Sequence, residues 1–136
     1  MKYTTSILIA VIVLSFESCK KQPEHLNENY IPVNKCQSFE VDGKILVCCL
    51  DSVIQDSRCP VNAICIWQGI AVARFSLNSE NKNHIITLAT TNFPPYNKEA
   101  IVSGFKIEFK NLLPQREMGK PFNYHDYVAE LRITRP

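Results

Sequence analysis

Hydrophobic and polar residues alternate with a period of two in several parts of the chain, which is typical of β-strands with one buried face. In the clearest case, Phe105, Ile107 and Phe109 alternate with charged residues. Residues 127–133 repeat the pattern, with apolar residues at every second position. No segment carries apolar residues at a convincing helical spacing, so strands are expected throughout.

Other segments extend the β pattern. Asp42-Gly43 lies between two short apolar runs and predicts a tight hairpin. Six or seven short strands in about 100 residues predict an all-β fold, either an antiparallel β-sandwich or a partly open barrel. Prolines and polar residues predict loops at 92–97 and 112–124. The remaining strands are expected at residues 38–41, 44–50, 64–77 and 84–90.

The N-terminal segment has the features of a secretory signal. A lysine precedes an apolar run from Ile7 to Leu14, and small residues lie just before Cys19. A membrane-spanning helix needs about 20 apolar residues, and this run is shorter. Residues 1–18 are therefore predicted to form a cleavable signal peptide.

The residues around Cys19 refine this prediction. Ser18-Cys19-Lys20-Lys21 resembles the lipobox of Bacteroidetes-type lipoproteins, although Phe16 stands where such signals usually have leucine. The resemblance implies that Cys19 carries a diacylglyceryl group and a third acyl chain such as palmitate. Two or more chains give stable anchoring to a membrane. Because Lys20 is not the aspartate typical of inner-membrane retention, we expect an outer-membrane location, facing the periplasm or the cell surface.

The rest of the chain divides into two parts. Residues 19–35 are rich in polar residues and proline, and are expected to form the lipidated N-terminus and a flexible tether. Residues 36–136 are expected to form the single β-sandwich domain. The formal net charge is only +2, without a long block of one sign, so nucleic acid is not an expected partner.

Six cysteines occur, and export to an oxidising compartment predicts disulfides among those that are not lipidated. Cys59 and Cys65 flank one short loop and are expected to pair. Cys36 is expected to pair with either Cys48 or Cys49, whose side chains point to opposite faces of a strand. Cys48 is taken as the candidate partner, which would leave Cys49 as the odd thiol, but the sequence leaves the choice between the two open.

The spacing of the cysteines also bears on metal binding. Five residues separate Cys59 from Cys65, and no second ligand pair follows, unlike the usual zinc sites. No metal or cofactor is therefore expected.

One motif inside the domain is distinctive. It reads Asp56-Ser57-Arg58-Cys59-Pro60, a short loop, and Cys65-Ile66-Trp67-Gln68-Gly69. This pattern resembles a motif of uncharacterised bacterial exported proteins, a resemblance that implies no activity. Structurally, the motif predicts a disulfide-closed strand entry in which Asp56 caps the turn or pairs with Arg58, and Gly69 makes room for Trp67. Functionally, Arg58 and Trp67 are candidates for a recognition loop.

These features favour a protein without catalytic activity. No hydrolase, metalloprotease or phosphate-loop motif occurs. We expect a membrane-anchored lipoprotein of the cell envelope that binds an unknown ligand, such as another envelope protein, or has a structural role. The alternative is an inhibitor of secreted trypsin-like proteases that presents Arg58, which requires an exposed, extended backbone around that residue.

Overall fold

The structure, a computed structural model, describes residues 29–136. The predicted signal peptide and the lipidation of Cys19 lie outside the described residues. Within them, no helix is long and apolar enough to cross a membrane. The elements are β1 (Tyr30–Pro32), β2 (Lys35–Val41), β3 (Lys44–Asp56), β4 (Ala71–Ser79), β5 (Lys82–Ala89), β6 (Glu99–Val102), β7 (Phe105–Leu113), the 3-10 turn η1 (Tyr124–Asp126) and β8 (Val128–Thr134).

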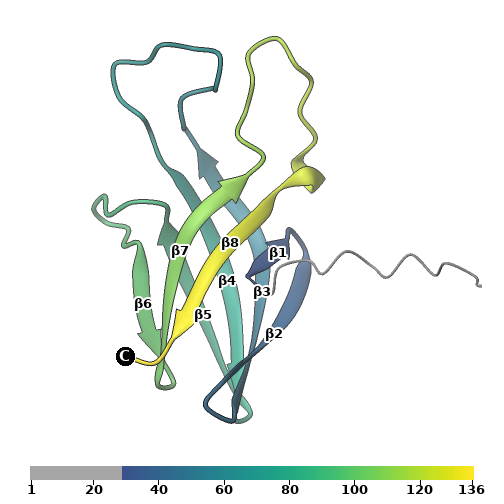
Figure 1. The fold of residues 1–136 in the computed structure, drawn as a ribbon, viewed down its shortest axis with the longest axis vertical. Coiled ribbons are helices and arrows are strands. Elements are labelled where there is room, and N and C mark those ends of the chain that lie inside the picture. The colour runs from purple at the N-terminus through teal and green to yellow at the C-terminus, as the bar shows by residue number, and fades with distance from the viewer. Residues whose placement is uncertain (1–28) are drawn as a thin grey trace, which may run out of the picture.

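The strands form two antiparallel sheets of four strands each, in the orders β1-β8-β7-β6 and β2-β3-β4-β5. The two sheets face each other as the layers of a sandwich (Figure 1). This confirms the predicted all-β antiparallel fold. The strand count of eight exceeds the expected six or seven because β1 and β6 are only three and four residues long, too short for a clear alternating pattern.

The core lies between the sheets and is built from the inward positions of the alternating strands. Phe105, Ile107 and Phe109 on β7 are fully buried, as their period-two spacing predicts. Phe75 on β4 meets Phe109 edge-on, with ring centroids 5.3 Å apart, and so joins the two sheets across the core. Burial of these apolar faces is the main force that holds the layers together.

Residues 30–35 belong to the sandwich, so the tether predicted for residues 19–35 is wrong in this part. Ile31 on β1 is completely buried, and β1 pairs with β8. Asn34, at a φ of 60°, turns the chain from β1 into β2 and hence from one sheet to the other. The sequence does not reveal this strand because the run from Tyr30 to Val33 is only four residues long and contains Pro32, which is unfavourable inside a sheet.

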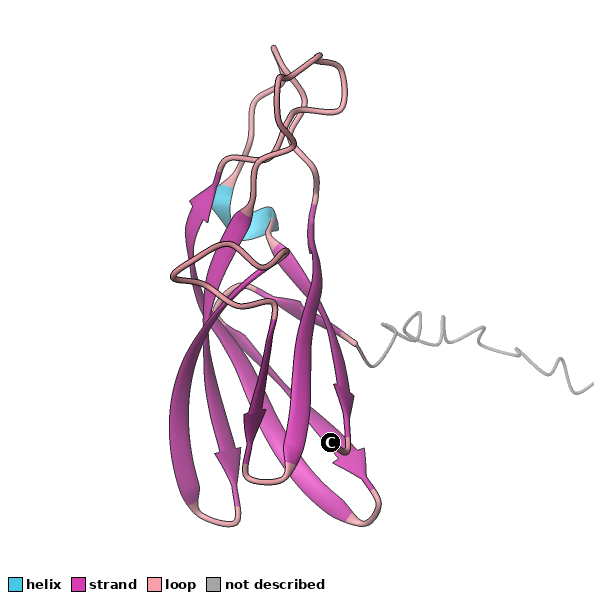
Figure 2. Ribbon diagram, turned by 90° about the vertical axis from the view of Figure 1, so that its left-hand side faces the viewer, coloured by secondary structure: helices cyan, strands magenta, loops and turns pink. Residues whose placement is uncertain are grey.

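The two ends of the sandwich differ. At one end, tight turns at Asp42-Gly43, 80–81 and 103–104 connect neighbouring strands, and all their residues have positive φ, as two-residue hairpins favour. The Asp42-Gly43 hairpin was predicted and is confirmed. At the other end, two long loops project beyond the strands (Figures 1 and 2). We call residues 57–70 the disulfide loop and residues 114–123 the proline loop.

The strand predicted for residues 64–77 begins only at Ala71. Residues 64–70 belong to the disulfide loop instead, where Ile64 and Ile66 are fully exposed to solvent. Gly69 has a φ of 67°, which is incompatible with a regular strand. The apolar residues that suggested a strand therefore lie exposed on a loop and are not part of the core.

The cysteine pairing corrects the assignment of Cys36. Cys36 is bonded to Cys49, and Cys48 is the free, buried thiol. The reason is the register, because Cys36 lies directly opposite Cys49 on the neighbouring strand, whereas the side chain of Cys48 points into the core. The predicted Cys59–Cys65 disulfide is present.

We expect Cys48 to be unreactive in the folded protein. Burial, with a smaller contribution from the charge of Asp51, raises the pKa of the Cys48 thiol to about 12, and the thiolate is the reactive form. Iodoacetamide should label Cys48 only after denaturation, as peptide mapping without reduction can show. Labelling of Cys49 instead, or of Cys48 under native conditions, would contradict the observed pairing.

Candidate functional site

The base of the disulfide loop continues the ladder between β3 and β4. The Ser57 N–H donates to the Ile70 carbonyl at 2.9 Å, and the Cys59 N–H donates to the Gln68 carbonyl at 2.9 Å. Gly69 is required here, because a Cβ atom at this position would lie 1.9 Å from the Ser57 carbonyl oxygen. Gly69 therefore makes room for a neighbouring backbone and not, as predicted, for Trp67.

A buried ion pair lies directly beneath the loop. The Arg58 Nε and Nη2 atoms donate to the two carboxylate oxygens of Asp56, at 2.7 and 2.8 Å. Their side chains are 11% and 3% exposed. Two parallel hydrogen bonds fix the geometry as well as the charge balance. The sequence predicted that Asp56 either caps the turn or pairs with Arg58, and the structure shows both, because Asp56 Oδ1 also accepts from the Arg58 backbone N–H at 3.3 Å.

Arg58 also ties the disulfide loop to the other sheet. Its guanidinium donates to the carbonyl of Leu112, at the end of β7, and to the carbonyl of Pro114 at 3.2 Å. The side chain thus points inward, where it uses its donors on Asp56 and two backbone carbonyls. Such a side chain is not free to enter the pocket of another protein.

Tyr127 completes the group around Asp56, donating its hydroxyl to the Asp56 carboxylate at 2.8 Å. Burial alone would raise the pKa of Asp56, but hydrogen bonds from Arg58 and Tyr127, together with the charge of Arg58, hold the pKa of that carboxyl below its usual value. The same contact and burial raise the pKa of Tyr127. Asp56 is therefore ionised, with its charge neutralised by Arg58.

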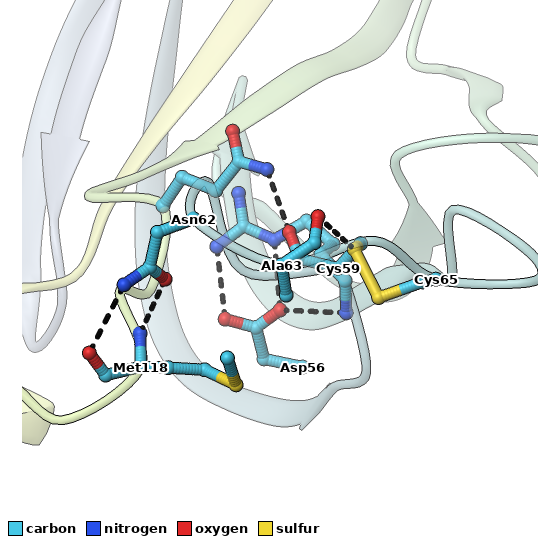
Figure 3. The surroundings of a disulfide bond; sticks show 8 residues. Asp56, Cys59, Asn62, Ala63, Cys65 and Met118 are labelled. Atoms are coloured by element: carbon cyan, nitrogen blue, oxygen red, sulfur yellow. Dashed lines mark hydrogen bonds and ion pairs between the residues drawn. A yellow bond between two sulfur atoms is a disulfide. The ribbon is translucent and has the colours of Figure 1, made fainter.

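Above this pair, the two loops are bonded to each other (Figure 3). The Asn62 amide donates to the Met118 carbonyl at 3.1 Å and accepts from the Met118 N–H at 2.7 Å. The Gln115 amide donates to the Cys59 carbonyl at 2.8 Å. The disulfide closes the loop between these contacts and contributes about 2 kcal/mol in the chain-entropy model.

The two bonded loops carry four exposed apolar residues. Ile64 and Ile66 flank Cys65 and are fully exposed, at 104% and 107%. Val61, on the same loop, and Met118, on the proline loop, are also exposed. Exposed apolar residues are unremarkable singly, but a group on an ordered loop marks a candidate interaction site. We call these four residues the tip patch.

Beside the tip patch lies a groove of about 940 Å³ between the disulfide loop and the loop that follows β5. Trp67 and Phe93 form its aromatic wall, with ring centroids 5.9 Å apart and planes tilted by 48°. Both rings remain about half exposed. Polar side chains of β7 and the loops, including Asn111 and Gln115, line the rest of the groove.

The structure separates the two residues of the predicted recognition loop. Trp67 is exposed at the surface, whereas Arg58 lies in the buried base of the loop. Tyr127 and the carbonyls that hold Arg58 could not be identified from the sequence, because they lie more than 50 positions away in the chain. The exposed isoleucines were missed because apolar residues usually indicate a buried strand.

Among residues 29–136, no three histidine, cysteine or acidic side chains come together in an arrangement that could hold a metal ion. The chain matches no protein-family model, and no curated protein or solved structure shows significant similarity to it.

We expect Asp56→Asn to lower the free energy of unfolding near neutral pH by about 3–5 kcal/mol, because the charge of Arg58 would stay buried without its partner. The native carboxyl has a lower pKa in the folded than in the unfolded state. Its contribution is present above the unfolded pKa, near 4, and is lost as the pH falls through the lower folded pKa. Urea unfolding at several pH values should show the two proteins converging only in acid.

Glu99→Gln is the matched control. Glu99 pairs with Lys106 at 2.9 Å on the surface, where both side chains are well exposed. Its loss should cost less than about 1 kcal/mol. Similar losses in the two variants would contradict a special role for the buried pair.

Proposed function

We propose that this protein is a lipid-anchored envelope lipoprotein whose tip patch binds another envelope protein through an apolar cleft of that partner. The observation that carries the proposal is the pair of fully exposed isoleucines, Ile64 and Ile66, on a loop that is bonded at its base and along its length. The motif at Cys19 supports the anchor, and its role is part of the proposal.

The arrangement of the tip favours binding over a purely structural role. Burial of exposed isoleucines in a partner would favour binding by about 25 cal/mol for each Å² of apolar surface removed from water. The Asp56–Arg58 pair and the disulfide fix the loop beforehand. A loop that is already ordered loses little conformational entropy when it binds.

The alternative of protease inhibition has less support. An inhibitor of trypsin-like enzymes must place an arginine side chain in the specificity pocket of the protease. The guanidinium of Arg58 is held by Asp56 and by the Leu112 and Pro114 carbonyls, with only 11% of the side chain exposed. Releasing it would break the base of the loop.

Site-specific photo-crosslinking in cells tests the proposal. A photoreactive residue at position 66 should give one discrete adduct with an envelope protein, and Ile64→Asp should abolish that adduct. Position 85 is the matched control, because Ile85 is also well exposed but lies on β5, away from the tip. Adducts of equal yield from both positions, or none from position 66, would contradict binding at the tip.

The anchor is tested in the same cells. Cys19→Ser should move the protein from the membrane fraction to the soluble fraction, because the lipidated thiol is removed. The mass of the wild-type N-terminal peptide should contain the diacylglyceryl group. A Cys19→Ser variant that stays in the membrane fraction would contradict the anchor without bearing on the tip patch.

A further inference from the structure

We infer that the groove beside the tip patch binds a neutral saccharide. The residues of the described chain that line the groove supply an aromatic wall and several uncharged hydrogen-bonding side chains, and their one charge, on Arg58, is paired with Asp56. Its volume of about 940 Å³ is within the range of small-molecule sites. The inference goes beyond the proposed function, because Ile64 and Ile66, which carry that function, do not line the groove, although Val61 of the tip patch does.

The aromatic wall suits the apolar face of a sugar ring. Trp67 is 55% exposed and Phe93 is 46% exposed, so both rings are available to a ligand. They come from different loops but lie in contact, tilted by 48°. A pyranose carries C–H groups on one face, and these pack on aromatic rings while its hydroxyl groups remain free at the edge.

The polar side chains are arranged to meet those hydroxyl groups. The Oδ1 atom of Asn111 accepts from the Leu112 N–H at 2.9 Å, which leaves its amide N–H groups as donors. The Nε2 atom of Gln115 donates to the Cys59 carbonyl, which leaves its Oε1 atom as an acceptor. Thr91 also lines the groove and carries a hydroxyl group. Fixed donors and acceptors beside an aromatic surface give orientation and specificity.

The absence of free charge defines the class of saccharide. Among residues 29–136, Arg58 is the only ionisable side chain that lines the groove, since the two lining cysteines form the disulfide. Its charge is neutralised by Asp56. A uronic acid, a sulfated sugar or a phosphate would lose hydration without gaining a counter-charge. The ligand is therefore an uncharged glycan segment.

Trp67 is the only tryptophan of the chain and reports directly on the groove. We expect a saturable change of its fluorescence on titration with at least one of cellohexaose, maltohexaose and chitohexaose at up to millimolar concentrations. Hexagalacturonate should cause no saturable change. Phe93→Ala should weaken binding about tenfold, whereas Phe93→Tyr, which retains the ring, should bind within about threefold of the wild type.

Ile66→Asp is the control for the neighbouring site. It should leave saccharide binding unchanged while it abolishes binding of the protein partner, so that failure of either hypothesis is recognised separately. No saturable change with any of the three neutral hexamers would overturn the inference. Equal or tighter binding of hexagalacturonate, or a Phe93→Ala variant that is folded by circular dichroism and binds as well as the wild type, would also overturn it.

Discussion

The buried pair between Asp56 and Arg58 is the interaction on which the end of the sandwich that carries the two long loops depends. Asp56 ends β3, and Arg58 lies two residues later, within the disulfide loop. Through Arg58 the pair reaches the end of β7, and through the hydroxyl of Tyr127 it reaches the start of β8. One ion pair thus connects both sheets to both long loops. Burying two charges gives little net stability, so its value here is the single geometry that its hydrogen bonds impose.

The sequence was sufficient to predict the layers of the fold but insufficient to predict the structure of the two long loops. Strands such as β7 are predictable because their alternation is dictated by burial of one face between two sheets. The start of β4 was not predictable, because Ile64 and Ile66 look like core residues but lie on an exposed loop. The choice between Cys48 and Cys49 depends on register, which the sequence leaves open by one residue.

The candidate site was likewise predictable only in part. The Asp56–Arg58 contact is local and was predicted, but the direction of Arg58 is set by carbonyl groups on a distant strand. Only the folded chain shows that Arg58 is buried while Trp67 is exposed. The proposed roles follow from this difference in exposure. The buried Asp56–Arg58 pair supports the loops, while the tip patch and the neighbouring groove are open to binding partners. A lipid anchor at Cys19 would hold both surfaces in the envelope.

The central claim is that the buried pair holds the two loops as one ordered unit, and amide hydrogen exchange tests it most directly. The N–H groups of Cys59, Val61 and Met118 donate across or between the loops. In the wild type all three should exchange slowly, and in Asp56→Asn they should lose protection together while the amides of β7 remain protected. Fast exchange of these amides in the wild type, or unchanged protection in the variant, would contradict the account.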